Sequence, residues 1–125
     1  MPLLAVGAGG CAGSVLRYLL SLFAQRYSIS FPHGTLWANL LGCFAIGAVA
    51  ALAAAGEILT PNARLLLATG LCGGFTTMSS FTYEIAQFLR ENDYLYAAGY
   101  FALTAIGCLL AFFLGAAAVK LILKA

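Results

Sequence analysis

The chain alternates long apolar runs with short polar breaks. Each run reaches the length of about 20 residues that a helix needs to cross a bilayer. Four such runs cover residues 3–23, 34–55, 64–89 and 94–123. Because short connections place successive helices side by side and antiparallel, the pattern predicts an all-α integral membrane protein with four transmembrane helices. Thr60 followed by Pro61 predicts the N-terminal cap and first residue of the third helix.

Composition supports the same class. The 125 residues are 63% hydrophobic and 8% charged, with a mean hydropathy of +0.99, whereas a soluble domain carries about 25% charged residues. We expect a single domain, residues 1–125, with the lipid bilayer around it. No basic cluster is long enough to follow a nucleic acid backbone, so no nucleic acid partner is expected. The N-terminus has no positively charged segment, and we expect the first run to be retained instead of cleaved as a signal peptide.

The basic residues give no preferred orientation in the membrane. Cytoplasmic loops normally carry an excess of Lys and Arg. With four spans, three basic residues fall on each side, namely Arg64, Lys120 and Lys124 on one and Arg17, Arg26 and Arg90 on the other. A chain without bias can insert both ways. We therefore expect two opposite copies to pair as an antiparallel, dual-topology homodimer.

Small residues spaced four apart let helices approach closely in lipid. Gly9 and Gly13 have this spacing in the first run, and Gly107, Ala111 and Gly115 have it in the fourth. Two uses remain open, packing within one subunit and packing between subunits.

Four cysteines fall one in each run and form no CxxC pair. They are Cys11, Cys43, Cys72 and Cys108. We expect them to be small buried apolar residues instead of a metal site or a disulfide frame.

Polar side chains recur along one face of three runs. The stripes are Thr35, Asn39 and Cys43; Ser80, Glu84 and Gln87; and Tyr100, Thr104 and Cys108. A lone Ser or Thr in lipid can simply bond a neighbouring carbonyl and pack, whereas the amide of Asn39 has four hydrogen-bonding sites and is hard to hide. Three stripes together favour a polar track across the membrane.

The most unusual stretch is GGFTTMSSFTYE, residues 73–84. Two adjacent glycines near the middle of a span predict a break in the third helix at Gly73–Gly74. A break frees carbonyls that lipid cannot satisfy, and such carbonyls often hold cations. If two antiparallel copies meet there, the carbonyls of Gly73 and Thr76 can form an oxygen cage around a small cation.

Three motifs in register resemble one known family. GGFTTMSSF resembles the third-helix signature GGFTTFSTF of the Fluc (CrcB-type) fluoride channels. PHGTLWANLLGCFAIG resembles its second-helix pattern, and GAGGCAGSVLRY resembles its first-helix glycines and arginine. The likeness covers essentially the whole chain.

The resemblance implies a fluoride-selective channel, not an enzyme, in the bacterial inner (plasma) membrane. It implies passive export of cytoplasmic fluoride down its gradient through two pores of a dual-topology homodimer, with a structural sodium ion at the centre. The sodium ligands would be the carbonyls of Gly73 and Thr76, and Arg17 would lie at a vestibule. The pore residues implied are Asn39, Thr35, Met78, Phe81, Ser79, Ser80, Glu84, Tyr100 and Thr104.

One residue departs from the family pattern. Met78 stands where the family has a phenylalanine, and a thioether offers no electropositive ring edge to an anion. Because Phe81 keeps its ring, we expect conduction to be retained. No basic residue occurs between Arg26 and Arg64 or between Arg64 and Arg90, which suits a pore that must release its anion quickly.

Two other classes remain as alternatives. A proton-coupled transporter of the small multidrug-resistance type also has four short spans, but it needs a carboxylate in the first helix, and residues 3–23 contain none. A non-conducting assembly protein would use the glycine stripes for packing alone.

Overall fold

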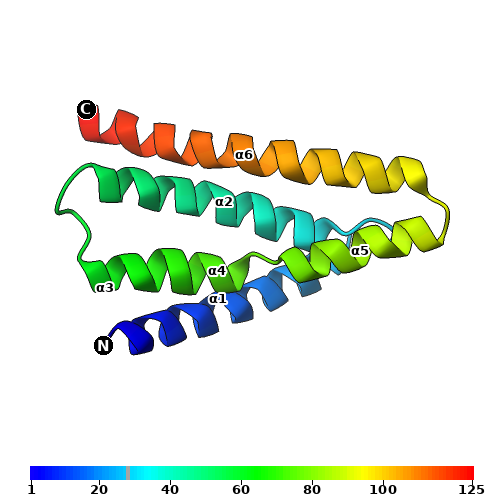
Figure 1. Ribbon diagram of the computed structural model, residues 1–125, viewed down its shortest axis with the longest axis horizontal. Helices are drawn as coiled ribbons and strands as arrows, with labels where there is room; N and C mark the ends of the chain where they lie inside the picture. Colours follow the sequence, from blue (N-terminus) through cyan, green and yellow to red (C-terminus); the bar gives the residue numbers. More distant parts are fainter. Residues whose placement is uncertain (28) are drawn as a thin grey trace.

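The computed structural model describes residues 1–27 and 29–125, and every regular element among them is a helix. Four helical arms lie roughly along one long axis (Figure 1). Three arms are single helices, α1 (Pro2–Gln25), α2 (His33–Ala54) and α6 (Tyr94–Lys124). The third arm consists of α3 (Pro61–Arg64), η1 (Leu65–Cys72), α4 (Gly73–Phe75) and α5 (Met78–Arg90).

The four predicted spans are confirmed as four arms. Within the described residues, α1, α2 and α6 are each long and apolar enough to cross a membrane. Both termini and the α2–α3 connection lie at one end of the molecule, and the other two connections lie at the opposite end (Figure 1). The predicted first connection includes residue 28, which lies outside the described residues. Thr60 caps α3 as expected, since its side chain accepts a hydrogen bond from the Ala63 N–H at 3.2 Å.

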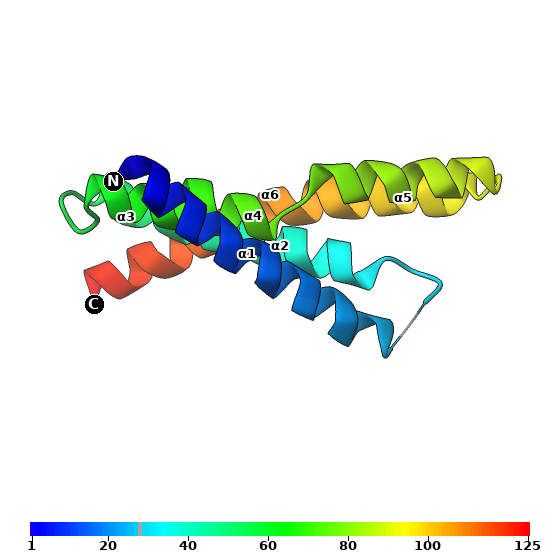
Figure 2. The same cartoon turned by 90° about the horizontal axis from the view of Figure 1, so that it is seen from below.

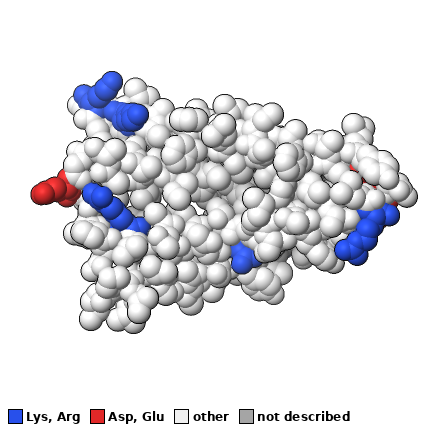
Figure 3. Space-filling view, in the orientation of Figure 1, with Lys and Arg blue, Asp and Glu red and all other residues white. Residues whose placement is uncertain are grey.

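Charged side chains gather at the two ends of the long axis. On the face shown in Figure 3, a broad band between them is almost free of charge. This distribution is that of a chain whose middle lies in hydrocarbon and whose ends reach water.

The break in the third arm is real, but its predicted position was wrong. Gly73 is helical, with φ −62° and ψ −39°, and α4 continues to Phe75. The backbone becomes extended at Thr76 (φ −82°, ψ 158°) and Thr77 (φ −151°, ψ 116°). Gly74 serves packing instead, because a Cβ at this position would collide with the backbone of Gly10 in α1.

Tight backbone contacts hold the arms together in two pairs. In the first pair, a Cβ at Gly9 would meet the Leu66 carbonyl oxygen of η1. In the second pair, α2 lies against α6, where a Cβ at Gly115 would meet the Phe44 carbonyl oxygen. The glycine stripes at these positions therefore pack within one chain. The eight residues of η1 form a π-helix, which the sequence pattern did not indicate.

A small aromatic core lies where α2, α5 and α6 meet. Its buried members are Leu36, Phe81 and Tyr100, with Phe31, Leu40, Ile85 and Phe88 packed around them. Tyr100 is 1% exposed. At this end α5 lies beside α6 while α1 and α2 diverge from them (Figure 2). The aromatic core joins α2 to α5 and α6.

Candidate functional site

The break in the third arm is bridged by a side chain of α2. The Thr77 N–H donates to Asn39 Oδ1 at 2.8 Å, and Asn39 Nδ2 donates to the Thr77 carbonyl at 3.1 Å. Asn39 is 8% exposed. Its amide thus satisfies both backbone groups of Thr77 where the helix does not, and one Nδ2 hydrogen remains for another acceptor.

This arrangement releases two carbonyls from the helical pattern. In a continuous helix, the Gly73 carbonyl would accept from the Thr77 N–H and the Thr76 carbonyl from the Ser80 N–H. Here the Thr77 N–H donates to Asn39, and the Ser80 N–H donates to Thr77 Oγ1 at 3.2 Å. The carbonyls of Gly73 and Thr76, which the resemblance implies as sodium ligands, therefore do not accept the hydrogen bonds that a continuous helix would give them.

Arg17 reaches the same break from α1. Its Nε donates to the Gly74 carbonyl at 3.2 Å, and the residue is partly buried. A guanidinium at the end of a helix satisfies a carbonyl that the next turn no longer covers. Arg17 thus holds α4 in place at its C-terminal end.

The second half of the arm begins with three hydroxyls. Thr77 caps α5, and its Oγ1 lies 3.2 Å from both Ser79 Oγ and Ser80 Oγ. Met78 is 74% exposed beside them. The carbonyl end of α4 and the amide end of α5 therefore face the same small region. The sequence analysis did not single out Thr77, although a Thr directly before a helical run is a capping signal.

A separate hydrogen-bonded group is centred on Glu84. Thr35 Oγ1 donates to Glu84 Oε1 and the Tyr100 hydroxyl donates to Glu84 Oε2, both at 2.6 Å. Thr35 and Tyr100 are buried. The three residues come from α2, α5 and α6. Two short hydrogen bonds hold the carboxyl group of Glu84 between two hydroxyls.

A groove of about 420 Å³ runs along the break. Its lining includes the predicted site residues Asn39, Gly73, Thr76, Met78, Phe81 and Thr104. Among the described residues that line it, none carries a charge. Thr104 is 7% exposed, and its Oγ1 has no hydrogen-bond partner in the part of the chain that the structure describes. Thr104 is thus a residue of the groove lining whose buried hydroxyl no described group of the chain satisfies.

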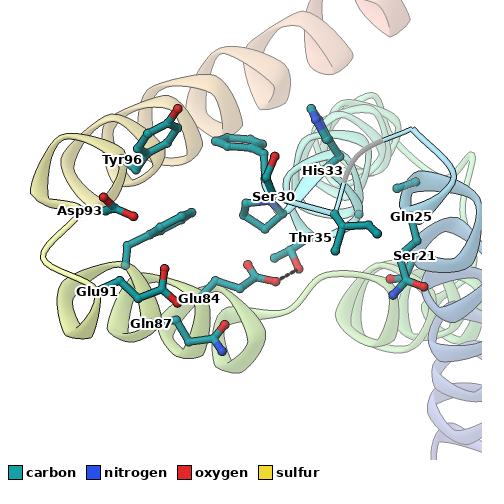
Figure 4. Close-up of a pocket in the computed structure, with 16 residues that line it drawn as sticks. Ser21, Gln25, Ser30, His33, Thr35, Glu84, Gln87, Glu91, Asp93 and Tyr96 are labelled. Atoms are coloured by element: carbon teal, nitrogen blue, oxygen red, sulfur yellow. Dashed lines mark hydrogen bonds between the residues drawn. The ribbon is translucent and has the colours of Figure 1, made fainter.

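A larger, polar pocket of about 980 Å³ opens at the end where α1 and α2 diverge from α5 and α6. Figure 4 shows Thr35 and Glu84 joined by their hydrogen bond at its wall, with Gln87 and Glu91 further out. The Phe81 ring lies 5.2 Å from the Tyr100 ring. Phe81 lines the groove and Glu84 lines the pocket, so a series of side-chain contacts from Phe81 through Tyr100 to Glu84 lies between the two spaces.

The predicted site residues thus form two groups. The first surrounds the groove, and Ser79, Ser80 and Arg17 lie along the break beside it. The second is Thr35, Glu84 and Tyr100 at the pocket wall. No group of three or more His, Cys, Asp or Glu side chains within residues 1–27 and 29–125 is placed to hold a metal ion.

Comparison with known proteins gives a consistent result. The family model described as CrcB-like protein, Camphor Resistance (CrcB), matches residues 4–116. A protein of Chlorobaculum tepidum is 48% identical over 118 residues, which cover 94% of each chain. One from Chlorobium phaeobacteroides is 44% identical over 95% of this chain and 93% of its own, and one from Leptospira interrogans is 45% identical over 84% of each. All three relatives are named fluoride-specific ion channel FluC.

Proposed function

This chain belongs to the CrcB-like family, a family of ion channels and not of enzymes, and on that basis we propose that it conducts fluoride. It is a multi-pass membrane protein with bacterial relatives. Its place is the bacterial plasma membrane, where it lets cytoplasmic fluoride leave down its electrochemical gradient. Weakly acidic HF enters a cell from acidic surroundings and dissociates inside, so a passive pore is sufficient for export.

The observation that carries this proposal is the uncharged groove with the unpartnered hydroxyl of Thr104. Fluoride is small and strongly hydrated, so a narrow path must offer donors as water is removed. The Thr104 hydroxyl, the free Nδ2 hydrogen of Asn39 and the edge of Phe81 are such donors. A Lys or Arg side chain in the path would hold the anion too tightly for rapid exit.

From the groove, the path continues to the pocket along Phe81, Tyr100 and Glu84. The Tyr100 and Thr35 hydroxyls donate to Glu84 in this structure. A hydroxyl that donates a hydrogen bond to a carboxylate can rotate and donate to an arriving fluoride ion instead. When no fluoride is bound, Glu84 keeps these two hydroxyls oriented. Ser79 and Ser80 supply further hydroxyls beside the break.

The same proposal includes an antiparallel homodimer with a structural sodium ion at its axis. One chain offers two released carbonyls, those of Gly73 and Thr76, which are too few for a small cation that prefers several oxygen ligands. A second, opposite copy doubles this number. Gly73 is exposed in the single chain, and the equal distribution of basic residues permits both orientations.

Fluoride efflux from liposomes tests the function directly. Purified protein is reconstituted with internal fluoride, and efflux is followed with a fluoride electrode after valinomycin is added to carry potassium. We expect efflux without any imposed pH gradient, and chloride-loaded liposomes should retain their chloride. Efflux that requires a pH gradient would instead indicate a coupled carrier, and absence of efflux would indicate an assembly protein.

A further inference from the structure

Phe31 lies two residues before α2, and a tight turn fixes its place. The intervening Pro32 has φ −78° and ψ 63°, and the His33 N–H donates to the Phe31 carbonyl at 2.8 Å. These values are those of an inverse γ-turn. The Pro32 carbonyl then accepts from the Leu36 N–H at 3.2 Å. Two successive hydrogen bonds therefore tie the backbone of Phe31 to the start of α2.

The Phe31 ring packs against Tyr100 of α6. Their ring centroids are 5.5 Å apart and the ring planes stand at 84°, the edge-to-face arrangement that aromatic pairs favour. Phe88 of α5 makes a second contact of this kind, at 6.1 Å and 70°. A third ring, that of Phe81, lies 5.2 Å away. Three rings thus enclose Tyr100, which is why only 1% of it is exposed.

Phe31 and Phe88 separate Tyr100 from the polar pocket. Both rings line this pocket together with Glu84, whereas the buried Tyr100 is absent from its described lining. The exposed Glu91 also lines the pocket, at an end of the molecule where charged side chains gather, so water reaches it. The Tyr100 hydroxyl nevertheless donates to Glu84 Oε2 at 2.6 Å. It therefore meets, from the dry side, a carboxyl group that the pocket reaches from the wet side.

We propose that Phe31 is a positioning residue of the fluoride path, which shelters the Tyr100 hydroxyl from pocket water and directs it at Glu84. A hydroxyl in a dry site donates more strongly than one that water surrounds. An arriving fluoride ion then competes for this donor with the carboxyl group of Glu84 and not with water. The role of Phe31 in conduction rests on the proposed function, whereas the shelter of Tyr100 does not.

The place of Phe31 in the chain suits this role. It lies four residues before Thr35, whose hydroxyl donates to Glu84 Oε1 at 2.6 Å. One short segment therefore holds both the ring that covers Tyr100 and the second hydroxyl on the carboxyl group. Phe88 instead stacks on Tyr96 at 5.8 Å and 21°. The sequence analysis did not single out Phe31, because its partner lies far along the chain.

Hydroxyl-radical footprinting tests the shelter without reference to flux, because the radicals oxidise side chains that contact water. The full-length protein is treated in detergent, and the oxidised fraction of each tyrosine is read by peptide mass spectrometry. We expect Tyr100 to be protected in the unmodified protein and to lose this protection in Phe31→Ala. Tyr96 lines the pocket and is 57% exposed, so its oxidation shows that every sample received the same dose.

Phe23→Leu is the matched control. Phe23 makes a similar edge contact with Tyr27, at 5.2 Å and 62°, and neither residue belongs to the described lining of the pocket. Tyr100 should therefore stay protected in this variant. Where Phe31→Ala does not elute like the unmodified protein, Phe31→Leu replaces it, since leucine keeps apolar bulk. Tyr100 that is oxidised in the unmodified protein, or still protected in the folded Phe31 variant, would overturn the shelter.

Fluoride efflux from liposomes tests the positioning role. We expect Phe31→Leu to lower efflux about fivefold, the rate factor that corresponds to one aromatic pair. Phe31→Tyr keeps the ring and should restore most of the rate, and Phe23→Leu should leave it unchanged. Phe31→Leu should also have less effect when Tyr100→Phe has already removed the hydroxyl.

Two results would overturn the positioning role. One is efflux through Phe31→Leu at the unmodified rate. The other is an equally slow rate for Phe31→Tyr and Phe31→Leu, which would show that the ring contact with Tyr100 is not what matters. A failure of the unmodified protein to conduct fluoride would instead refute the proposed function, and the footprint of Tyr100 would still decide whether Phe31 shelters it.

Discussion

The side-chain amide of Asn39 replaces the helical partners of Thr77, with hydrogen bonds of 2.8 Å and 3.1 Å to its N–H and carbonyl. One polar residue of α2 thereby stabilises a break in the third arm that lipid alone would not tolerate. The carbonyls released by this break and the open donor left on Asn39 lie along the same groove. The proposed cation site and the proposed anion path thus depend on the same pair of residues.

Gly13 should contribute strongly to stability because the backbone of α1 touches the third arm at this residue. A Cβ at this position would meet the Leu71 carbonyl oxygen, and neither backbone can move easily. We expect Gly13→Ala to destabilise the protein by about 3 kcal/mol, measured as a lower midpoint of thermal unfolding in detergent. Gly7→Ala is the matched control, since nothing lies within 4 Å of its Cβ position. Equal midpoints for both variants would contradict the packing described.

Gly73 should tolerate a methyl group within one chain but not at a dimer axis. Its Cβ position finds only the Ala68 carbonyl oxygen, at 3.9 Å. We therefore expect Gly73→Ala to fold normally and to lose dimer, measured by light scattering during size-exclusion chromatography. Gly99→Ala, also open in the single chain, should keep the dimer mass. Replacing sodium with N-methylglucamine should weaken the dimer of the unmodified protein. An unchanged mass for Gly73→Ala would argue against a cation at this position.

Thr35 and Tyr100 should act together because both donate to Glu84. We expect Thr35→Val and Tyr100→Phe each to reduce stability by about 1 kcal/mol. Since the two bonds share one carboxylate, the double variant should differ from the sum of the singles. Tyr18→Phe serves as a control, because Tyr18 is 63% exposed. Strict additivity would show that the two hydroxyls do not depend on a common partner.

Phe81 and Met78 should contribute unequally to conduction. Phe81 is 7% exposed and packs against Tyr100, whereas Met78 is 74% exposed and has no ring edge to offer. We expect Phe81→Leu to lower fluoride efflux far more than Met78→Leu, measured at equal protein-to-lipid ratios. A larger effect of Met78→Leu would place the narrow part of the path on the opposite side of the groove.

Hydrophobic patterning was sufficient to predict the four arms. The predicted runs end within a few residues of the observed elements, since burial in lipid demands a long apolar helix whatever its neighbours are. The cap at Thr60 was also predictable, because capping depends on adjacent residues alone. The single domain spanning residues 1–125 stays a prediction.

The hydrogen-bond partners within the site could not be predicted, because they join residues that lie far apart in the sequence. Thr35 and Asn39 share a helical face, yet one bonds Glu84 and the other bonds Thr77. The break was placed at Gly73 because glycine is a poor helix former, but Gly73 is helical and the next residue, Gly74, packs closely against Gly10 of α1. The break falls three residues later, where Thr77 caps the next helix.

The most direct test of the central claim is fluoride efflux through Asn39→Asp in liposomes. An aspartate cannot donate to the Thr77 carbonyl, and it places negative charge in the groove that fluoride must enter. Asn62→Asp is the matched control, because Asn62 is exposed in α3. With both variants eluting like the unmodified protein, we predict no efflux for Asn39→Asp and unchanged efflux for Asn62→Asp. Efflux through Asn39→Asp at the unmodified rate would contradict a fluoride path along this groove.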